Sequence, residues 1–304
     1  MFKMIHLGNE DEIFEAEIAI VPLQSLYVHE EILEEYLTKL IRLISKSGVF
    51  KHPIIVDKNS GVILDGMHRY TALKRLGYDY IVAYLVDYNH SSIQIGRWHR
   101  EIEGTIPVNF LREIESKLSH FFEINGEFVR VSFETLEEDM NSRKAAFGIY
   151  VEERRELYGF YCDVKDIHEF FYMIRKTELM IRNKLNNANM RYFSDEFLKN
   201  LESRPYRGGE RKRLIIIVPR ITKREVVYYA TRGRIFPPKT TRHIIPIRPL
   251  FVNYPMNLLR KSGYDLDFLN QVLSKMLSQR RILKVRGKVY IDRFYEDDYL
   301  IIFS

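Results

Sequence analysis

The feature that most constrains the fold is the stretch ILDGMHRYTALKRLG, residues 63–77, in which an apolar run meets a helical pattern at Asp65-Gly66. The run before Asp65 favours a buried strand, and the spacing after Gly66 favours a helix. The first amide groups of such a helix lack intrahelical partners and favour an anion in front of them. With a glycine that admits a ligand, and with His68 and Arg69 in the same turn, this unit indicates a phosphate site. The same residues also suit an ordinary turn in which Asp65 caps the helix and Arg69 is exposed.

The residues around this unit predict a small core of alternating helices and strands. Apolar residues at spacings of three and four predict a helix over His29–Lys46, with Gly48 as its stop. Short β-branched runs on either side of a Lys-Asn-Ser turn predict a hairpin. We expect the strands of this core at residues 15–26, Pro53–Asp57, Gly61–Asp65 and Ile81–Tyr88.

The rest of the chain has a mixed pattern, which predicts further α/β structure. We expect helices at Asn109–His120, Val164–Leu185, Thr222–Arg232 and Asp265–Gln279. We expect strands at Glu127–Phe133, Phe147–Val151, Glu156–Cys162, Leu214–Val218, 282–291 and 298–303. Ser203–Glu210, which holds Pro and two Gly residues, is expected to be a loop.

The positive charge of the chain is confined to one block. The formal net charge is +6, but residues 1–203 sum to −8, residues 204–248 to +11 and residues 249–304 to +3. A basic block of this kind can bind nucleic acid, bind the phosphates of a nucleotide, or face solvent. Its position therefore excludes a basic surface over the whole protein and leaves those three roles open.

Several classes of protein are excluded by what the sequence lacks. A single cysteine, Cys162, allows no intrachain disulfide and no thiolate-rich metal site. The nine histidines include no H-x-H or H-x-x-x-H pair, which argues against a zinc enzyme. No apolar run approaches the ~18 residues of a membrane helix, and the N-terminus has no apolar signal core. We therefore expect a cytoplasmic protein that does not insert into a membrane.

The order of motifs in Val21–Asp87 resembles the ParB/sulfiredoxin superfamily. The matching elements are VPLQSL, EYLTKLIRLISKSGVF, HPIIVD and ILDGMHRYTALKRLG, in that order over about 70 residues. Sulfiredoxins carry a nucleophilic cysteine beside the His-Arg of the turn, where this chain has Met67. Partition proteins carry a different turn and a helix-turn-helix region downstream. The resemblance therefore implies a ParB/sulfiredoxin-like core but neither of these two activities.

The third branch of the superfamily, the free L-serine kinases, is similar to this chain in four places. The four are His29-Glu30 before the first helix, Ser47-Gly48 at its end, the DGMHR turn, and Pro238–His243, PKTTRH. One position departs from the pattern, because Met67 stands where the kinases have the first of two histidines. The resemblance implies an enzyme that phosphorylates the free amino acid.

In that family the two carboxylates at the positions of Glu30 and Asp65 are catalytic. The resemblance implies that Glu30 is the general base and that Asp65 contacts the hydroxyl group or Mg²⁺. By spacing alone, Glu30 is one of several acids that would stabilise the start of a helix. Glu31 is its rival as the base, and the sequence does not decide between them.

The PKTTRH loop places two cations, two hydroxyl groups and an imidazole within five residues, which suits a phosphate. A basic surface turn is the alternative. Trp98, the only tryptophan, is expected to lie near the serine, and a packing role is the alternative. Its neighbours Arg97, His99 and Arg100 could contact anions or be exposed to solvent. We expect nucleotide and phosphate contacts from Ser47, Gly48, Gly66, Met67, His68, Arg69, Lys239, Thr240 and Thr241, and serine contacts from Trp98, Arg242 and His243.

Together these features predict a kinase that transfers a phosphoryl group from ATP or ADP to free L-serine with Mg²⁺, giving O-phospho-L-serine. We expect a nucleotide-binding core in residues 1–104, a mixed α/β domain with the PKTTRH loop in residues 105–250, and a helix–hairpin extension in residues 251–304. The alternative function is a ParB-like, nucleotide-dependent DNA-binding regulator. Its support is the basic block and a final helix with two strands, which could be part of a winged helix. The residues do not indicate which nucleotide is the donor or whether the protein is an oligomer.

Overall fold

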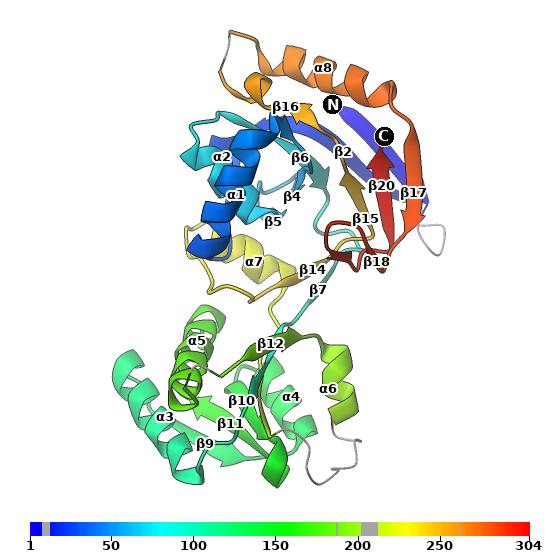
Figure 1. Ribbon diagram of the computed structural model, residues 1–304. Coiled ribbons are helices and arrows are strands. Elements are labelled where there is room, and N and C mark those ends of the chain that lie inside the picture. Colours follow the sequence, from blue (N-terminus) through cyan, green and yellow to red (C-terminus); the bar gives the residue numbers. More distant parts are fainter. Residues whose placement is uncertain (8–12, 187, 202–211, 262) are drawn as a thin grey trace. The chain divides into compact units, whose positions relative to one another are not determined.

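A computed structural model describes residues 1–7, 13–186, 188–201, 212–261 and 263–304 (Figure 1). The loop expected at Ser203–Glu210 lies outside these residues. The chain forms two compact units. Unit 1 holds Met1–Ile95, Lys223–Pro238 and His243–Ser304, and unit 2 holds Gly96–Thr222 and Lys239–Arg242. The predicted domains were three consecutive segments, residues 1–104, 105–250 and 251–304. The two units are grouped differently, because the residues after 250 belong to unit 1 together with the N-terminal residues. As a scheme of functional domains, the three segments stay a prediction.

Unit 1 is built on a sheet with the strand order β1-β2-β6-β4-β5. Neighbouring strands are antiparallel, except for the parallel pair β4 and β6. Ile54, Ile55 and Val56 are all buried, as in a strand that is covered on both faces. The strands predicted in this region are confirmed as β2 (Ile13–Pro22), β4 (Ile54–Asp57), β5 (Ile63–Asp65) and β6 (Tyr80–Val86), with β1 (Phe2–Leu7) added at the edge.

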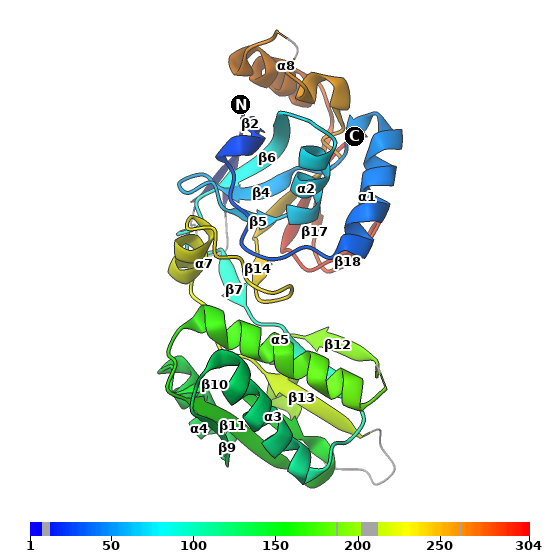
Figure 2. The same ribbon diagram turned by 90° about the vertical axis from the view of Figure 1, so that its left-hand side faces the viewer.

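Two helices, α1 (Glu34–Ser47) and α2 (Met67–Arg75), pack against each other beside this sheet (Figure 2). The predicted stop of α1 is confirmed, because Gly48 has φ +65° at its end. The predicted start at His29 is wrong. The Phe236 amide donates to the His29 carbonyl oxygen and the Glu31 amide donates to the Phe236 carbonyl oxygen, both at 2.8 Å. Because these backbone groups pair with another segment, residues 29–31 are extended and cannot enter the helix.

The C-terminal residues add a second sheet and a helix to unit 1. In this sheet β15 (Ile247–Leu250) lies parallel to β20 (Tyr299–Phe303), and β17 (Ile282–Arg286) pairs antiparallel to β20. Helix α8 (Leu266–Ser278) confirms the predicted helix, and its Asn270 amide bonds the backbone N–H and C=O of Ile20 in β2. The smaller elements of unit 1 are η2 (Leu23–Ser25), β3 (Val49–Phe50), α7 (Lys223–Ala230), β16 (Tyr254–Pro255), η4 (Met256–Leu259), β18 (Val289–Tyr290) and β19 (Phe294–Tyr295).

Unit 2 is an antiparallel sheet with helices on both faces. Its strand order is β12-β8-β13-β10-β11-β9. The strands are β8 (His99–Glu103), β9 (Gly126–Arg130), β10 (Ala145–Val151), β11 (Glu156–Cys162), β12 (Met190–Phe193) and β13 (Arg213–Ile217). The helices are α3 (Val108–Phe122), α4 (Phe133–Asn141), α5 (Ile167–Lys184) and α6 (Asp195–Leu201), with η3 (Glu152–Arg154).

The predicted helices at Asn109–His120 and Val164–Leu185 are confirmed as α3 and α5, whereas α4 was not predicted. Helix α4 begins where the Ser132 hydroxyl accepts a hydrogen bond from the Thr135 amide at 3.1 Å. Its Leu136 packs over Gly148 of β10, where a Cβ atom would collide with the leucine side chain. Two further short strands are β7 (Gln94–Gly96) and β14 (Arg242–Ile244).

The two units confirm the predicted α/β class. Across the ranges that the structure covers, no helix is both long and apolar enough to cross a membrane.

Candidate functional site

The Asp65-Gly66 turn joins β5 to α2 in unit 1. Gly66 has φ +96°, and a Cβ atom there would lie 2.6 Å from Ile54 Cγ2 and 2.8 Å from Arg69 Nη2. Only glycine suits this position, for reasons of both backbone conformation and space. The residue at the helix cap is Gly66, which has no side chain that could cap the first turn of α2. The alternative in which Asp65 caps this helix is therefore wrong.

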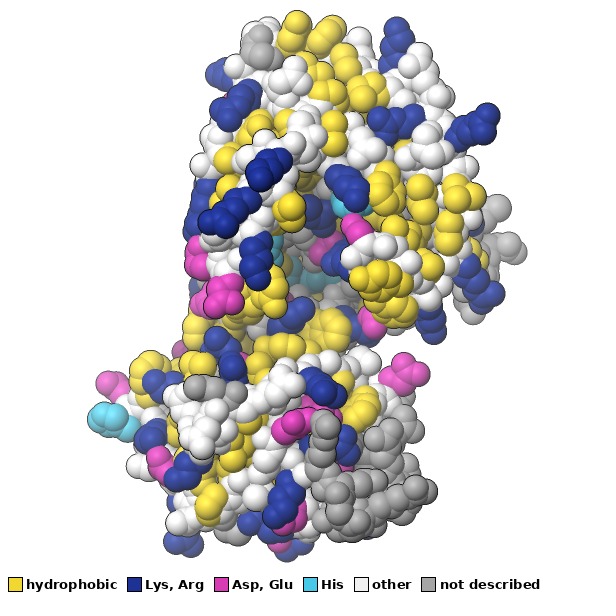
Figure 3. All heavy atoms as spheres, viewed as in Figure 1, with side chains coloured by type: hydrophobic (Ala, Val, Ile, Leu, Met, Phe, Trp, Pro, Cys, Tyr) yellow, Lys and Arg dark blue, Asp and Glu magenta, His cyan; other side chains and the backbone are white. Residues whose placement is uncertain are grey.

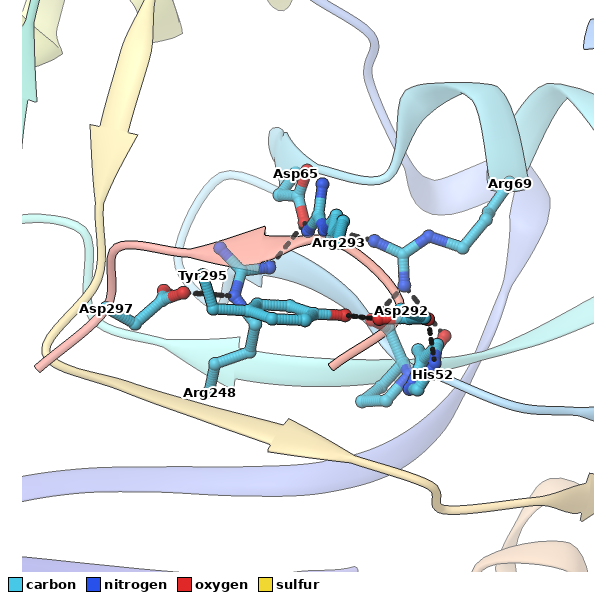
Figure 4. Close-up of polar contacts among 9 residues, drawn as sticks. His52, Asp65, Arg69, Arg248, Asp292, Arg293, Tyr295 and Asp297 are labelled. Atoms are coloured by element: carbon cyan, nitrogen blue, oxygen red, sulfur yellow. Dashed lines mark hydrogen bonds and ion pairs between the residues drawn. The ribbon is translucent and has the colours of Figure 1, made fainter. Parts of the chain in front are cut away.

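Asp65 instead faces three guanidinium groups (Figure 4). Its Oδ2 atom lies 3.0 Å from Arg69 Nη2, 2.5 Å from Arg248 Nη1 and 3.6 Å from Arg293 Nη2. Burial raises the pKa of Asp65, but the charges of Arg248, Arg69 and Arg293 outweigh it and hold the pKa well below its ordinary value. Asp65 is therefore ionised and already neutralised by arginine.

This arrangement does not fit Mg²⁺ at Asp65. A divalent cation would have to approach a carboxylate that three cations already surround. Magnesium also prefers several oxygen ligands, and the described residues contain no group of three or more His, Cys, Asp or Glu side chains that could hold a metal.

Glu30 lies beside the first residue of α2. The Glu30 amide donates to Met67 Sδ at 3.4 Å, so the methionine that departs from the kinase motif holds Glu30 at the turn. Glu30 is buried, whereas Glu31 is exposed. His29 Nε2 lies 3.8 Å from Glu30 Oε1, and His29 Nδ1 donates to the Ile63 carbonyl oxygen at 2.8 Å. Burial lowers the pKa of His29, so its ring is neutral and carries its proton on Nδ1.

His243 of the PKTTRH motif lies against the same histidine. The two rings meet edge to face with centroids 5.2 Å apart. Tyr88 Oη lies 2.6 Å from His243 Nε2, and burial lowers the pKa of His243 well below its ordinary value. The hydrogen bond from Tyr88 therefore orients a neutral imidazole. Tyr88 was not predicted as a site residue, because it follows β6 and belongs to no motif.

The other predicted residues near this turn make local contacts. His68 Nε2 accepts a hydrogen bond from the Leu33 amide at 3.1 Å, just before α1. Arg69 Nη1 donates to the carbonyl oxygens of His52 and Pro53 at 2.8 and 2.6 Å, so Arg69 is not the exposed residue of the alternative. Ser47 Oγ bonds the carbonyl oxygens of Ile44 and Val49 at the end of α1. Among the described residues, these local bonds do not connect Ser47 to the Asp65 turn.

Trp98 in unit 2 meets two residues of the PKTTRH motif. Lys239 Nζ and Arg242 Cζ each lie 5.3 Å from the centre of a Trp98 ring, which is cation–π distance. Thr240 and Thr241 between them are buried. Unit 2 therefore brings together an aromatic ring and both cations that were expected to contact phosphate or serine.

Buried ion pairs hold the segment around Trp98, which directly precedes β8. Arg97 bonds Asp195, Glu137 and the Val218 carbonyl oxygen, and Arg100 Nη1 donates to the Trp98 carbonyl oxygen at 2.6 Å. Glu178 lies 3.5 Å from Arg100 Nε, and both side chains are 1% exposed. The alternative in which these residues are exposed is wrong. Burying arginine without a carboxylate partner is costly, so the paired acids explain how both can lie in the interior.

The contacts between C-terminal residues and Asp65 were not predicted from the sequence either. Arg248 Nε lies 2.9 Å from both carboxylate oxygens of Asp297, and both residues are buried. A signal was available, since Arg248 interrupts the apolar run IIPIRPL and an arginine in a buried strand needs an acidic partner. No such signal marks Arg293, which lies in a polar segment.

Two known proteins are similar to this chain over most of its length, although no family model matches it. The ATP-dependent L-serine kinase of Staphylothermus marinus is 30% identical over 253 residues, which cover 80% of this chain and 92% of that protein. The ADP-dependent L-serine kinase SerK of Thermococcus kodakarensis is 24% identical over 242 residues, covering 77% of this chain and 89% of that protein.

A solved structure has a similar fold. It is an alanine variant of a free serine kinase in complex with AMP, with a TM-score of 0.63 and 21% identity, covering 80% of this chain and 94% of that chain. The likeness confirms the predicted fold over most of the chain.

Proposed function

This chain belongs to the L-serine kinase family, and we propose that it transfers a phosphoryl group from ATP or ADP to the hydroxyl group of free L-serine. The product is O-phospho-L-serine. The observation that carries the proposal is the pairing of a buried carboxylate with the glycine-capped start of a helix. Met67, the first residue of α2, contacts the Glu30 amide, and the cap residue of that helix is a glycine. A base and an anion site are thus adjacent, as phosphoryl transfer requires.

Glu30 is the general base in this proposal. It takes the proton of the serine hydroxyl group while the serine oxygen forms its bond to phosphorus. The bond between phosphorus and the nucleotide oxygen breaks, and its electron pair leaves with the nucleotide. Burial beside Met67 and His29 supports Glu30 over the exposed Glu31.

The phosphates are assigned to the start of α2. The side chains of His68 and Arg69 bond the backbone of neighbouring segments. We therefore assign phosphate binding mainly to the backbone of Gly66, Met67 and His68, with Ser47 and Gly48 as further contacts. Lys239, Thr240 and Thr241 are assigned to phosphate, and Trp98, Arg242 and His243 to serine. Mg²⁺ is assigned to the phosphates of the nucleotide rather than to Asp65.

The alternative, a DNA-binding regulator, has less support. Several cations of the basic block pair with acids: Arg213 with Glu152, Arg220 with Glu137 and Arg248 with Asp297. On the face shown in Figure 3, Lys and Arg side chains are interspersed with acidic and apolar ones and form no continuous stripe. Strong duplex binding with a steep salt dependence would favour the regulator.

The site of action is proposed to be the cytoplasm. Cys162 is buried, and burial raises the pKa of its thiol, so it is a packing residue rather than a reactive one. A lone buried thiol suits a reducing compartment.

The proposal is tested by incubating the protein with L-serine and Mg²⁺, and with ATP or ADP in separate reactions. Phosphoserine detected by mass spectrometry, with ADP formed from ATP or AMP formed from ADP, is the expected result. It also identifies the donor, which the relatives leave open because they are named for both nucleotides. The absence of phosphoserine with either nucleotide would reject the proposed function.

The role of Glu30 is tested by Glu30→Gln, which should fold and lose about 10²–10⁴-fold in kcat, as expected for loss of a general base. Glu31→Gln is the matched control and should retain turnover. Near-normal turnover of Glu30→Gln would show that another residue is the base.

A further inference from the structure

Asp65 carries one negative charge but lies against three guanidinium groups. Arg248 and Arg69 both donate hydrogen bonds to Asp65 Oδ2, and Arg293 Nη2 lies 3.6 Å from the same atom. Asp297 offsets part of this charge through Arg248. Three guanidinium groups therefore face two carboxylates. Like charges at this separation repel each other, so the arrangement leaves a place for a further anion.

The three arginines differ in how many other contacts hold them in place. Arg69 also bonds two backbone carbonyl oxygens, and Arg248 is buried with both Asp297 oxygens at 2.9 Å from its Nε. The Arg293 side chain is 55% exposed, and its distance of 3.6 Å to Asp65 is longer than a hydrogen bond. An exposed ion pair of this kind contributes about 0–1 kcal/mol. Arg293 can therefore leave Asp65 for a stronger anion at little cost.

Arg293 is held in reach of the helix start by the C-terminal segment. It lies between β18 and β19, and its guanidinium group lies 4.8 Å from the centre of the Tyr295 ring (Figure 4). The Tyr295 hydroxyl donates to Asp292 at 2.9 Å, and Asp292 lies 3.2 Å from His52 Nε2. These contacts tie the β18–β19 hairpin to the segment before β4, and Asp65 directly precedes the Gly66 cap of α2.

We propose that Arg293 is a catalytic residue that contacts the phosphoryl group during its transfer and stabilises the charge on its oxygens. This inference rests on the proposed function. Asp65 holds Arg293 in place until the nucleotide binds, and the guanidinium group then bonds the more highly charged phosphate.

The step needs no proton from arginine. The serine oxygen bonds to phosphorus, the bond from phosphorus to the nucleotide oxygen breaks, and the proton goes to Glu30. Arg293 stays protonated throughout and donates hydrogen bonds to the phosphoryl oxygens. An arginine in this role is worth about 10³–10⁵ in kcat in other phosphoryl-transfer enzymes.

The test compares Arg293→Ala with Arg286→Ala, which removes the same charge from the exposed surface of β17 in the same C-terminal segment. With the donor that supports wild-type turnover, Arg293→Ala should lower kcat by about 10³-fold, with a smaller change in the KM for serine. Arg293→Lys keeps the charge without the planar donors and should show an intermediate loss. Arg286→Ala should match the wild type.

Chemical rescue separates a catalytic role from a structural one. Guanidine hydrochloride at millimolar concentration should restore part of the kcat of Arg293→Ala and leave Arg286→Ala unchanged, because a merely structural contact would not be replaced in solution. If the wild type makes phosphoserine and the two alanine variants have equal kcat, the inference alone fails. If the wild type makes none, the proposed function fails and the inference fails with it.

Discussion

In both units cations contact a candidate functional side chain, but the chemical type of that side chain differs. At Asp65 in unit 1 the partner is a carboxylate, and arginine holds its pKa well below the ordinary value. At Trp98 in unit 2 the partner is an aromatic ring under Lys239 and Arg242. A cation–π contact is worth about 0.5–1 kcal/mol when exposed, whereas a buried ion pair costs several kcal/mol to break. The contacts at Asp65 should therefore contribute more to stability than the contacts at Trp98.

The comparison is tested most strongly at Asp65. Asp65→Asn leaves Arg69, Arg248 and Arg293 around a neutral group, so we expect a loss of about 3 kcal/mol in the free energy of unfolding. Urea denaturation at pH 7 measures it. Asp298→Asn, at the exposed residue next to Asp297, is a control for removal of one negative charge and should change stability little. A loss at Asp65 no larger than at Asp298 would contradict the structural role.

The pH dependence of the loss of stability in Asp65→Asn tests the same structural role of Asp65. The folded-state pKa of Asp65 is lowered, so its contribution is complete above the ordinary value of about 3.9. It is lost as the pH falls from there through the folded-state pKa. The difference in unfolding free energy between the wild type and Asp65→Asn should be constant from about pH 8 to 5 and shrink below about pH 4. A difference that grows on acidification would show that the arginines do not stabilise the charged form.

The smallest effect is expected at Trp98. Trp98→Leu removes the ring and should raise the KM for serine about fivefold, equivalent to about 1 kcal/mol. It should reduce stability less than Asp65→Asn does. Trp98→Phe keeps a ring and should have an intermediate KM. A KM that does not change in either variant would assign Trp98 to packing alone.

Local patterns predicted the elements that carry the site. The strand, the Asp-Gly turn and the helix of residues 63–77 form as expected, because glycine alone accepts the backbone at residue 66 and the apolar spacing defines the rest. The helix expected from His29 begins at Glu34, since the Phe236 pairing occupies residues 29–31 and has no local signal. The role of Met67 was also invisible in the sequence, because its contact to the Glu30 amide depends on how two segments meet.

By itself, the sequence determined the α/β class, the Asp65-Gly66 turn and the identity of the residues that resemble serine kinases. Those features follow from spacing and backbone conformation within short segments. The tertiary structure alone decided what surrounds Asp65, because Arg248, Arg293 and Asp297 come from more than 180 residues away along the chain. It also decided that Arg97 and Arg100 are buried beside acids. The charge on a residue can be read from sequence, but the partner that neutralises it depends on which distant segments pack together.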